Sequence, residues 1–170
     1  MKRLLSAVAV AVVMAAPAAH AEFKFKQENL YVGGGLGYTM FDGAGIKNAM
    51  GYQFFGGYDL EMKLGDKVDT ALEVGYQSSG DLEFENCAGF LGFACKGDAA
   101  TGLWINGVFT YPVDDKIGVL GRIGLDIGDD DGLMFGAGAG YKLAPQFTLR
   151  GEFVIHPNYK SLEANVVYDF

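Results

Sequence analysis

The sequence alternates between apolar and small or polar residues at every second position, and it does so in eight separate segments. In one of them, Ile123 and Leu125 alternate with Arg122, Gly124 and Asp126. Successive side chains of a β-strand point to opposite faces, so a period of two predicts strands with one apolar face. The segments lie at 30–40, 50–62, 68–77, 103–111, 117–127, 133–142, 147–156 and 162–170. The chain is therefore expected to be all-β.

The connections between these segments alternate between two kinds. Short turns lie at 64–66, 112–115 and 144–145. Longer loops lie at 42–48, 79–99, 128–131 and 156–160. Short turns on one side and longer loops on the other are typical of outer-membrane barrels, in which the short turns face the periplasm. The pattern predicts an eight-stranded antiparallel up-and-down transmembrane β-barrel with both termini in the periplasm.

The first 21 residues have the pattern of a secretory signal peptide. A basic start is followed by apolar and small residues at 4–19, and Ala19-His20-Ala21 fits the small-x-small cleavage pattern. A transmembrane anchor is disfavoured because the run is shorter than about 18 residues and contains Pro17. We therefore expect a cleaved signal peptide at 1–21 and one barrel domain at 22–170.

The two faces of the strands distinguish a membrane barrel from a soluble one. After residue 21 no apolar run approaches the roughly 20 residues that a membrane helix needs. Only helices and closed barrels satisfy every backbone group in lipid. The second face of the strands is rich in glycine, which weakens a solvated strand but suits a sheet that curves tightly around a narrow lumen. The sequence therefore favours a membrane barrel over a soluble β-sandwich or a lipocalin-like barrel.

The net charge excludes one class of partner. The whole chain carries −8, and loss of Lys2 and Arg3 with the signal peptide leaves −10 on the mature protein. A protein that follows nucleic-acid phosphates needs the opposite sign, so no nucleic-acid partner is expected.

Three segments carry a resemblance to a known family. Tyr31–Tyr38 and Phe135–Tyr141 are glycine-rich alternating strands, and Ala164–Phe170 alternates up to a terminal Phe. Over its whole mature length the chain resembles the OmpA-like and opacity-type small outer-membrane barrels, which include the OmpX-type proteins. The resemblance implies a bacterial outer-membrane location, with outer-membrane lipid and lipopolysaccharide as neighbours. It also implies that Tyr168 and Phe170 form the signal that the outer-membrane assembly machinery recognises.

Four charged residues are expected near mid-height inside the barrel: Glu73, Arg122, Arg150 and Glu152. Buried charges must be paired or hydrated. An eight-stranded barrel is only wide enough for side chains, so a plug of salt bridges is the favoured interpretation. A gate or a narrow, porin-like path for ions or small solutes is the alternative.

The long loop at 79–99 contains both cysteines, Cys87 and Cys95. An even count in an exported protein suggests a disulfide, worth about 2–3 kcal/mol if unstrained, with two free thiols as the alternative. The loop also holds an apolar cluster, made up of Phe84, Phe90, Leu91 and Phe93. Such a cluster at a cell surface suggests contact with a host or surface ligand or with lipopolysaccharide. Alternatively, these side chains fold over the barrel mouth or lie in the outer leaflet.

Candidates for catalysis and metal binding are few. His156 is the only histidine left after processing, and Ser161 and Glu163 follow it. Outer-membrane lipid A deacylases are also eight-stranded and use His, Ser and Glu, but their His and Ser lie two apart on one strand. Here a loop intervenes, so His156 is expected to be a barrel-rim residue. The run Asp129-Asp130-Asp131 lacks the ligand spacing of a calcium loop, and no cofactor or metal is expected.

The sequence therefore favours a non-enzymatic outer-membrane protein with a structural or surface-interaction role, which includes adhesion. A channel for ions or small solutes is the second hypothesis, and a lipid A-modifying enzyme is a disfavoured third. A monomer is expected because a closed barrel has no free sheet edge.

Overall fold

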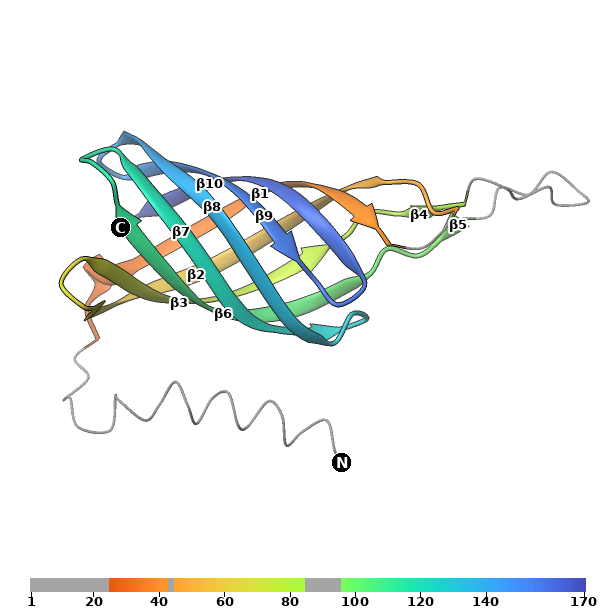
Figure 1. Ribbon diagram of the computed structural model, residues 1–170, viewed down its shortest axis with the longest axis horizontal. Helices are drawn as coiled ribbons and strands as arrows, with labels where there is room; N and C mark the ends of the chain where they lie inside the picture. Colours follow the sequence, from red (N-terminus) through yellow and green to blue (C-terminus); the bar gives the residue numbers. More distant parts are fainter. Residues whose placement is uncertain (1–24, 43–44, 85–95) are drawn as a thin grey trace, which may run out of the picture.

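Eight long antiparallel strands form one closed barrel in the computed structural model, which describes residues 25–42, 45–84 and 96–170 (Figure 1). The order around the barrel is β1-β10-β9-β8-β7-β6-β3-β2. The strands are β1 Leu30–Phe41, β2 Ala49–Leu64, β3 Val68–Ser78, β6 Thr101–Pro112, β7 Ile117–Gly128, β8 Gly132–Ala144, β9 Phe147–Ile155 and β10 Tyr159–Asp169. The predicted eight-stranded antiparallel barrel is confirmed.

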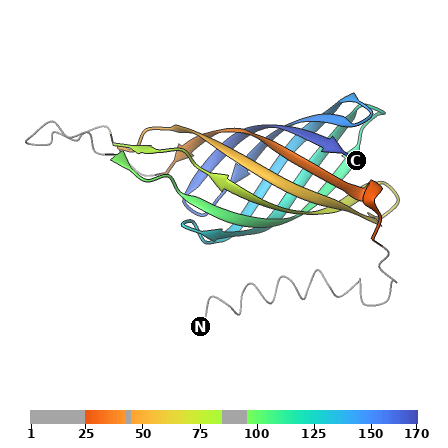
Figure 2. The same ribbon diagram turned by 180° about the vertical axis from the view of Figure 1, so that it is seen from behind.

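Three short elements were not predicted. A 3₁₀ turn, η2 (Gln27–Asn29), precedes β1, and two strands of two residues, β4 (Leu82–Glu83) and β5 (Lys96–Gly97), pair with each other outside the barrel. Figures 1 and 2 show this pair extending from the end of the barrel opposite to the short turns. A strand of two residues is too short to produce a detectable alternation. In the described part of the chain, no helix is long and apolar enough to cross a membrane.

The last strand closes the barrel against the first. The β1–β10 register runs from Tyr31 opposite Asp169 to Phe41 opposite Tyr159. Beyond the strand, the backbone N–H of Phe170 donates to the carbonyl oxygen of Leu30 at 3.2 Å. Closure leaves no long strand with an unpaired edge, as a lipid environment requires.

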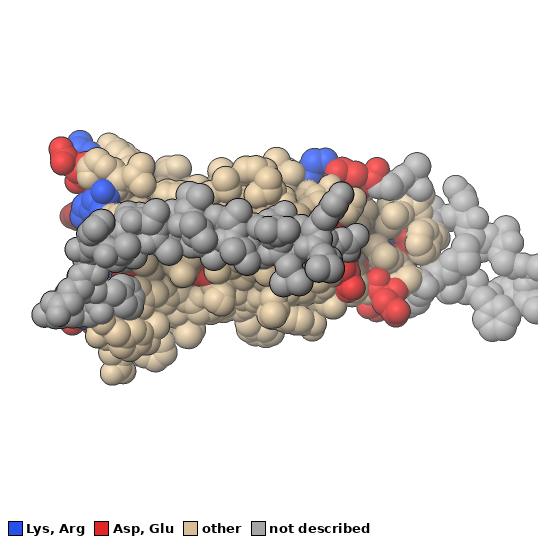
Figure 3. Space-filling model, turned by 90° about the horizontal axis from the view of Figure 1, so that it is seen from below, with Lys and Arg blue, Asp and Glu red and all other residues tan. Residues whose placement is uncertain are grey.

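The outer surface of the barrel is apolar where the sequence predicted it. Leu36, Phe54 and Leu103 are 60%, 63% and 60% exposed. Figure 3 shows that charged side chains gather toward the two ends of the barrel, while the visible surface between them is mainly uncharged. Large apolar side chains exposed around a closed barrel fit a lipid surface and not water.

Glycine lines the inside of the barrel because large lumen side chains leave no room for more. A Cβ at Gly57 would lie 2.1 Å from Cζ of Tyr31, and one at Gly75 would lie 2.6 Å from the Trp104 ring. The alternating glycines therefore make space for the side chains that fill the lumen.

Candidate functional site

Four charged side chains meet at mid-height in the lumen, and we call them the central charge cluster: Glu73 of β3, Arg122 of β7, and Arg150 and Glu152 of β9. Arg150 Nη1 donates to Glu73 Oε1 at 2.6 Å, and Arg122 Nη2 lies 3.2 Å from Glu73 Oε2 and 2.8 Å from Glu152 Oε2. The Tyr31 hydroxyl also donates to Glu73 Oε1, at 2.8 Å. These are the four residues expected from the sequence, and the structure brings them together.

Polar side chains from β2 and β10 extend this network toward the outer end of the barrel. Gln53 Nε2 donates to Glu163 Oε2 at 2.5 Å and to Asn165 Oδ1 at 3.0 Å. Asn165 Nδ2 donates in turn to Glu152 Oε1 at 3.2 Å. Sequence patterning places Gln53 and Asn165 on the inner face, but their partners depend on register between strands that are distant in sequence.

The lumen is filled at the height of the central charge cluster. The side chains of Glu73, Arg122 and Glu152 have no exposed surface. The guanidinium carbon of Arg122 lies 5.2 Å from the centre of the Trp104 ring, and that of Arg150 lies 5.7 Å from the centre of the Phe55 ring. Paired charges and aromatic rings thus pack together in the middle of the lumen.

His156 directly follows β9 at the outer end of the barrel, where the sequence placed it, but its side chain is buried in the lumen. It is 3% exposed; its Nδ1 is 2.7 Å from Asp126 Oδ2 and its Nε2 is 3.2 Å from Ser161 Oγ. Ser161 Oγ also donates to Glu163 Oε1 at 2.7 Å. The tight β9–β10 hairpin causes this arrangement, because it returns the chain so that Ser161 lies beside His156.

The Asp126–His156–Ser161 distances are within the range of a hydrolytic triad, but the surroundings differ from those of one. Ser161 is 3% exposed, and the cavity beside it holds only about 20 Å³, which is room for a water molecule. Tyr159 stacks on His156 at 4.1 Å between ring centres. The Glu163 carboxylate would repel the oxyanion of an acyl intermediate, so the geometry favours a structural hydrogen-bond network.

The outer mouth of the barrel has a hollow of about 480 Å³. Its lining combines apolar and acidic side chains, among them Phe41, Ile46, Leu82, Pro157, Asp42, Asp129 and Asp130. Asp129 Oδ2 accepts from Thr101, and Asp130 accepts from Asn158. Uncharged donors thus hold both carboxyl groups, and neither forms an ion pair among the described residues. No group of His, Cys, Asp and Glu in the described ranges has the arrangement of a metal site.

The loop prediction lies largely outside the described residues. Cys87, Cys95, Phe90, Leu91 and Phe93 belong to the segment 85–95, which the structure does not describe. Phe84 is described, is 41% exposed, and forms an isolated antiparallel bridge with Ile46.

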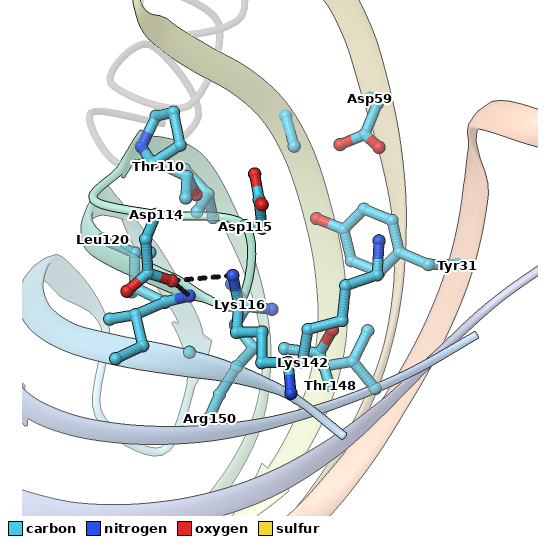
Figure 4. Close-up of a pocket in the computed structure, with 17 residues that line it drawn as sticks. Tyr31, Asp59, Thr110, Asp114, Asp115, Lys116, Leu120, Lys142, Thr148 and Arg150 are labelled. Atoms are coloured by element: carbon cyan, nitrogen blue, oxygen red, sulfur yellow. Dashed lines mark hydrogen bonds between the residues drawn. The ribbon is translucent and has the colours of Figure 1, made fainter. Parts of the chain in front are cut away.

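The periplasmic half of the lumen, in contrast, contains a cavity of about 300 Å³ (Figure 4). It extends from Tyr31 and Arg150 down to the turn between β6 and β7. In that turn Asp114 Oδ1 accepts from the backbone N–H groups of Lys116 and Ile117 at 2.7 and 2.8 Å, which lowers the pKa of Asp114 below its usual range.

A model of the outer membrane protein beta-barrel domain family matches residues 5–170. The chain belongs to this family. It is therefore a bacterial outer-membrane β-barrel. No curated protein sequence matches the chain significantly.

Solved structures with the same fold include designed, adhesive and enzymatic barrels. A de novo designed transmembrane β-barrel is 17% identical and has a TM-score of 0.58, with 87% of this chain and 100% of that chain covered. Ail, the attachment invasion locus protein of Yersinia pestis, is 12% identical and has a TM-score of 0.54, with 84% of this chain and 99% of Ail covered. The outer-membrane enzyme PagL is 16% identical and has a TM-score of 0.55, with 82% of this chain and 99% of PagL covered. Enzymes and non-enzymatic proteins thus share this fold, and the site decides between them.

Proposed function

We propose that this protein acts at the cell surface as an adhesin-like binding protein, with the barrel as a plugged scaffold. The observation that carries the proposal is the central charge cluster, whose buried ion pairs occupy the middle of the lumen and support a plugged barrel. A closed lumen leaves the outer mouth and the loop at 79–99 as the surfaces for interaction. The fold shared with an attachment protein supports the same role.

The charges at the outer mouth favour a basic partner. Ail has been solved with the heparin analogue sucrose octasulfate, a polyanion. In this chain the described lysine side chains at the outer end are already paired, Lys47 with Glu83 at 3.4 Å and Lys160 with Asp42 at 2.5 Å. Further acids there include Asp81, Asp98, Asp129 and Asp130. A surface of this sign attracts cationic segments and repels sulfated polysaccharides.

Whole-cell binding tests the proposal. Cells that express the protein are expected to bind host matrix or host cells more than empty cells do, and deletion of 84–95 is expected to remove the gain. Heat-modifiable gel mobility of the deletion variant serves as the control for a folded barrel. Unchanged binding after the deletion would remove this loop as the recognition surface.

A channel is the second candidate, because the periplasmic cavity already reaches Arg150. In that case the barrier consists of the central charge cluster and the network outside it. Removal of the Arg122 side chain takes away contacts to Glu73 and Glu152 and should open a path. Planar-bilayer recording should then give a changed conductance for Arg122→Ala; identical or absent conductance in both proteins would reject the channel.

A lipid A-modifying activity is disfavoured by the buried Ser161 and the adjacent Glu163. We expect mass spectrometry of lipid A to give the same species with and without the protein, and with Ser161→Ala. A mass change that depends on Ser161 would establish the enzyme instead.

A further inference from the structure

The periplasmic cavity has apolar walls although it lies in the lumen of the barrel. Ala71, Val108, Leu120 and Val167 line it, and each of them is at most 7% exposed. These side chains lie just below the central charge cluster. A lumen that holds only water would be lined by polar groups, so this apolar belt favours a guest with an apolar body.

Two lysines stand at the mouth of the cavity on one wall. Lys116 and Lys142 both line it, and the backbone N–H of Lys142 donates to the carbonyl oxygen of Lys116 at 2.8 Å. The two side chains therefore start from adjacent positions. No ion pair among the described residues includes either lysine.

Among the described residues no acid forms an ion pair with either lysine, although Asp114 attracts Lys116 and Asp169 attracts Lys142 electrostatically. The Asp114 carboxylate is occupied by two backbone N–H groups of its own turn. Asp59 lies across the cavity from Lys116 in Figure 4, and Asp115 lies on the turn itself. Arg150 adds a third positive group at the inner end of the cavity, where it is paired with Glu73.

We propose that the periplasmic cavity binds a single-chain amphipathic anion, an alkyl carboxylate or alkyl phosphate. The anionic head lies between Lys116 and Lys142, and the chain lies against Val108, Leu120 and Val167. The volume of about 300 Å³ is at the lower end for small-molecule sites, which fits a short chain. Since the central charge cluster closes the lumen above, the ligand enters and leaves on the periplasmic side and does not cross the membrane.

NMR titration of the full-length barrel in phosphatidylcholine nanodiscs tests this site. The probes are octanoate, octyl phosphate, octylammonium and acetate. Octanoate and octyl phosphate should each give saturable shifts at the methyl groups of Val108, Leu120 and Val167, and the tighter of the two identifies the head group. Octylammonium, with the opposite charge, and acetate, with no chain, should each bind at least tenfold more weakly. Partition into lipid is recognised by shifts at the outward methyl groups of Leu103 and Val119.

Variants separate the site from general charge effects. The double variant Lys116→Gln/Lys142→Gln should weaken octanoate at least tenfold, and the control Lys47→Gln/Lys160→Gln, at the opposite end, should leave it unchanged. Val108→Thr, which keeps the shape but adds a hydroxyl, should weaken octanoate and not alter heat-modifiable mobility. Any of three outcomes would overturn the proposal. The first is shifts confined to Leu103 and Val119, and the second is binding of octylammonium or acetate that equals that of octanoate. The third is unaltered octanoate binding in Lys116→Gln/Lys142→Gln.

Discussion

Glu73 is the residue on which the central charge cluster depends most. It accepts from Arg150, Arg122 and Tyr31 inside a fully buried site. In Glu73→Gln the carboxylate that pairs with both Arg122 and Arg150 becomes an uncharged amide. Removing one partner of a buried ion pair in this way costs about 3–5 kcal/mol of stability. Urea titration of the refolded barrel, followed by gel mobility, should give a loss of this size. The matched control Lys47→Gln breaks the exposed pair with Glu83 and should change stability by about 0–1 kcal/mol; equal effects would mean that the cluster is not a stabilising plug.

Asp114 gives the periplasmic turn a pH dependence of known sign. Its pKa lies below the ordinary value of 3.8 because two backbone N–H groups donate to the charged form. Because the pKa of Asp114 is lower in the folded state, its carboxylate stabilises the fold at pH values above 3.8. This stabilisation is lost as the pH falls through the pKa that Asp114 has in the folded state. The NMR titration midpoint of the Asp114 carboxyl should thus lie below 3.8, and the amide shifts of Lys116 should follow it. In Asp114→Asn the Lys116 amide should no longer titrate; a midpoint at or above 3.8 would contradict the assigned hydrogen bonds.

At the scale of strands, local pattern and long-range register contribute different information. Alternation predicts the strands and their faces, because the direction of a side chain depends only on its position along its own strand. It therefore places Glu73, Arg122, Arg150 and Glu152 in the lumen. It does not give the position of one strand relative to another, which is why the contact of His156 with Asp126 was missed. The sequence did contain one signal for the contact between His156 and Ser161, because the two residues stand on either side of a short hairpin loop.

The final strand combines closure of the barrel with the predicted assembly signal. Tyr168 packs against Phe147 at 5.2 Å and against Phe170 at 5.3 Å between ring centres, and the Phe170 N–H reaches Leu30. Phe170→Ser keeps that backbone bond, so refolding into pure lipid should change little. Assembly in cells should instead fall several-fold, measured as the heat-modifiable fraction in outer membranes. Tyr111→Ser removes an exposed aromatic of β6 at the same end of the barrel, and this control should assemble nearly as well as the parent.

The whole molecule is polarised along the barrel axis, which fixes its orientation in the membrane. The short turns and both ends of the barrel domain lie at one end, and the β4–β5 extension lies at the other (Figures 1 and 2). In outer-membrane barrels the short turns are periplasmic, so Asp98 should face the medium and Asp115 the periplasm. In a Cys87→Ser/Cys95→Ser background, Asp98→Cys should react with a membrane-impermeant maleimide on intact cells, and Asp115→Cys only after permeabilisation. If Cys87 and Cys95 form the predicted disulfide, the parent protein should react with the maleimide only after reduction. Reaction of Asp115→Cys on intact cells would show the reverse orientation, with the proposed adhesive surface facing the periplasm.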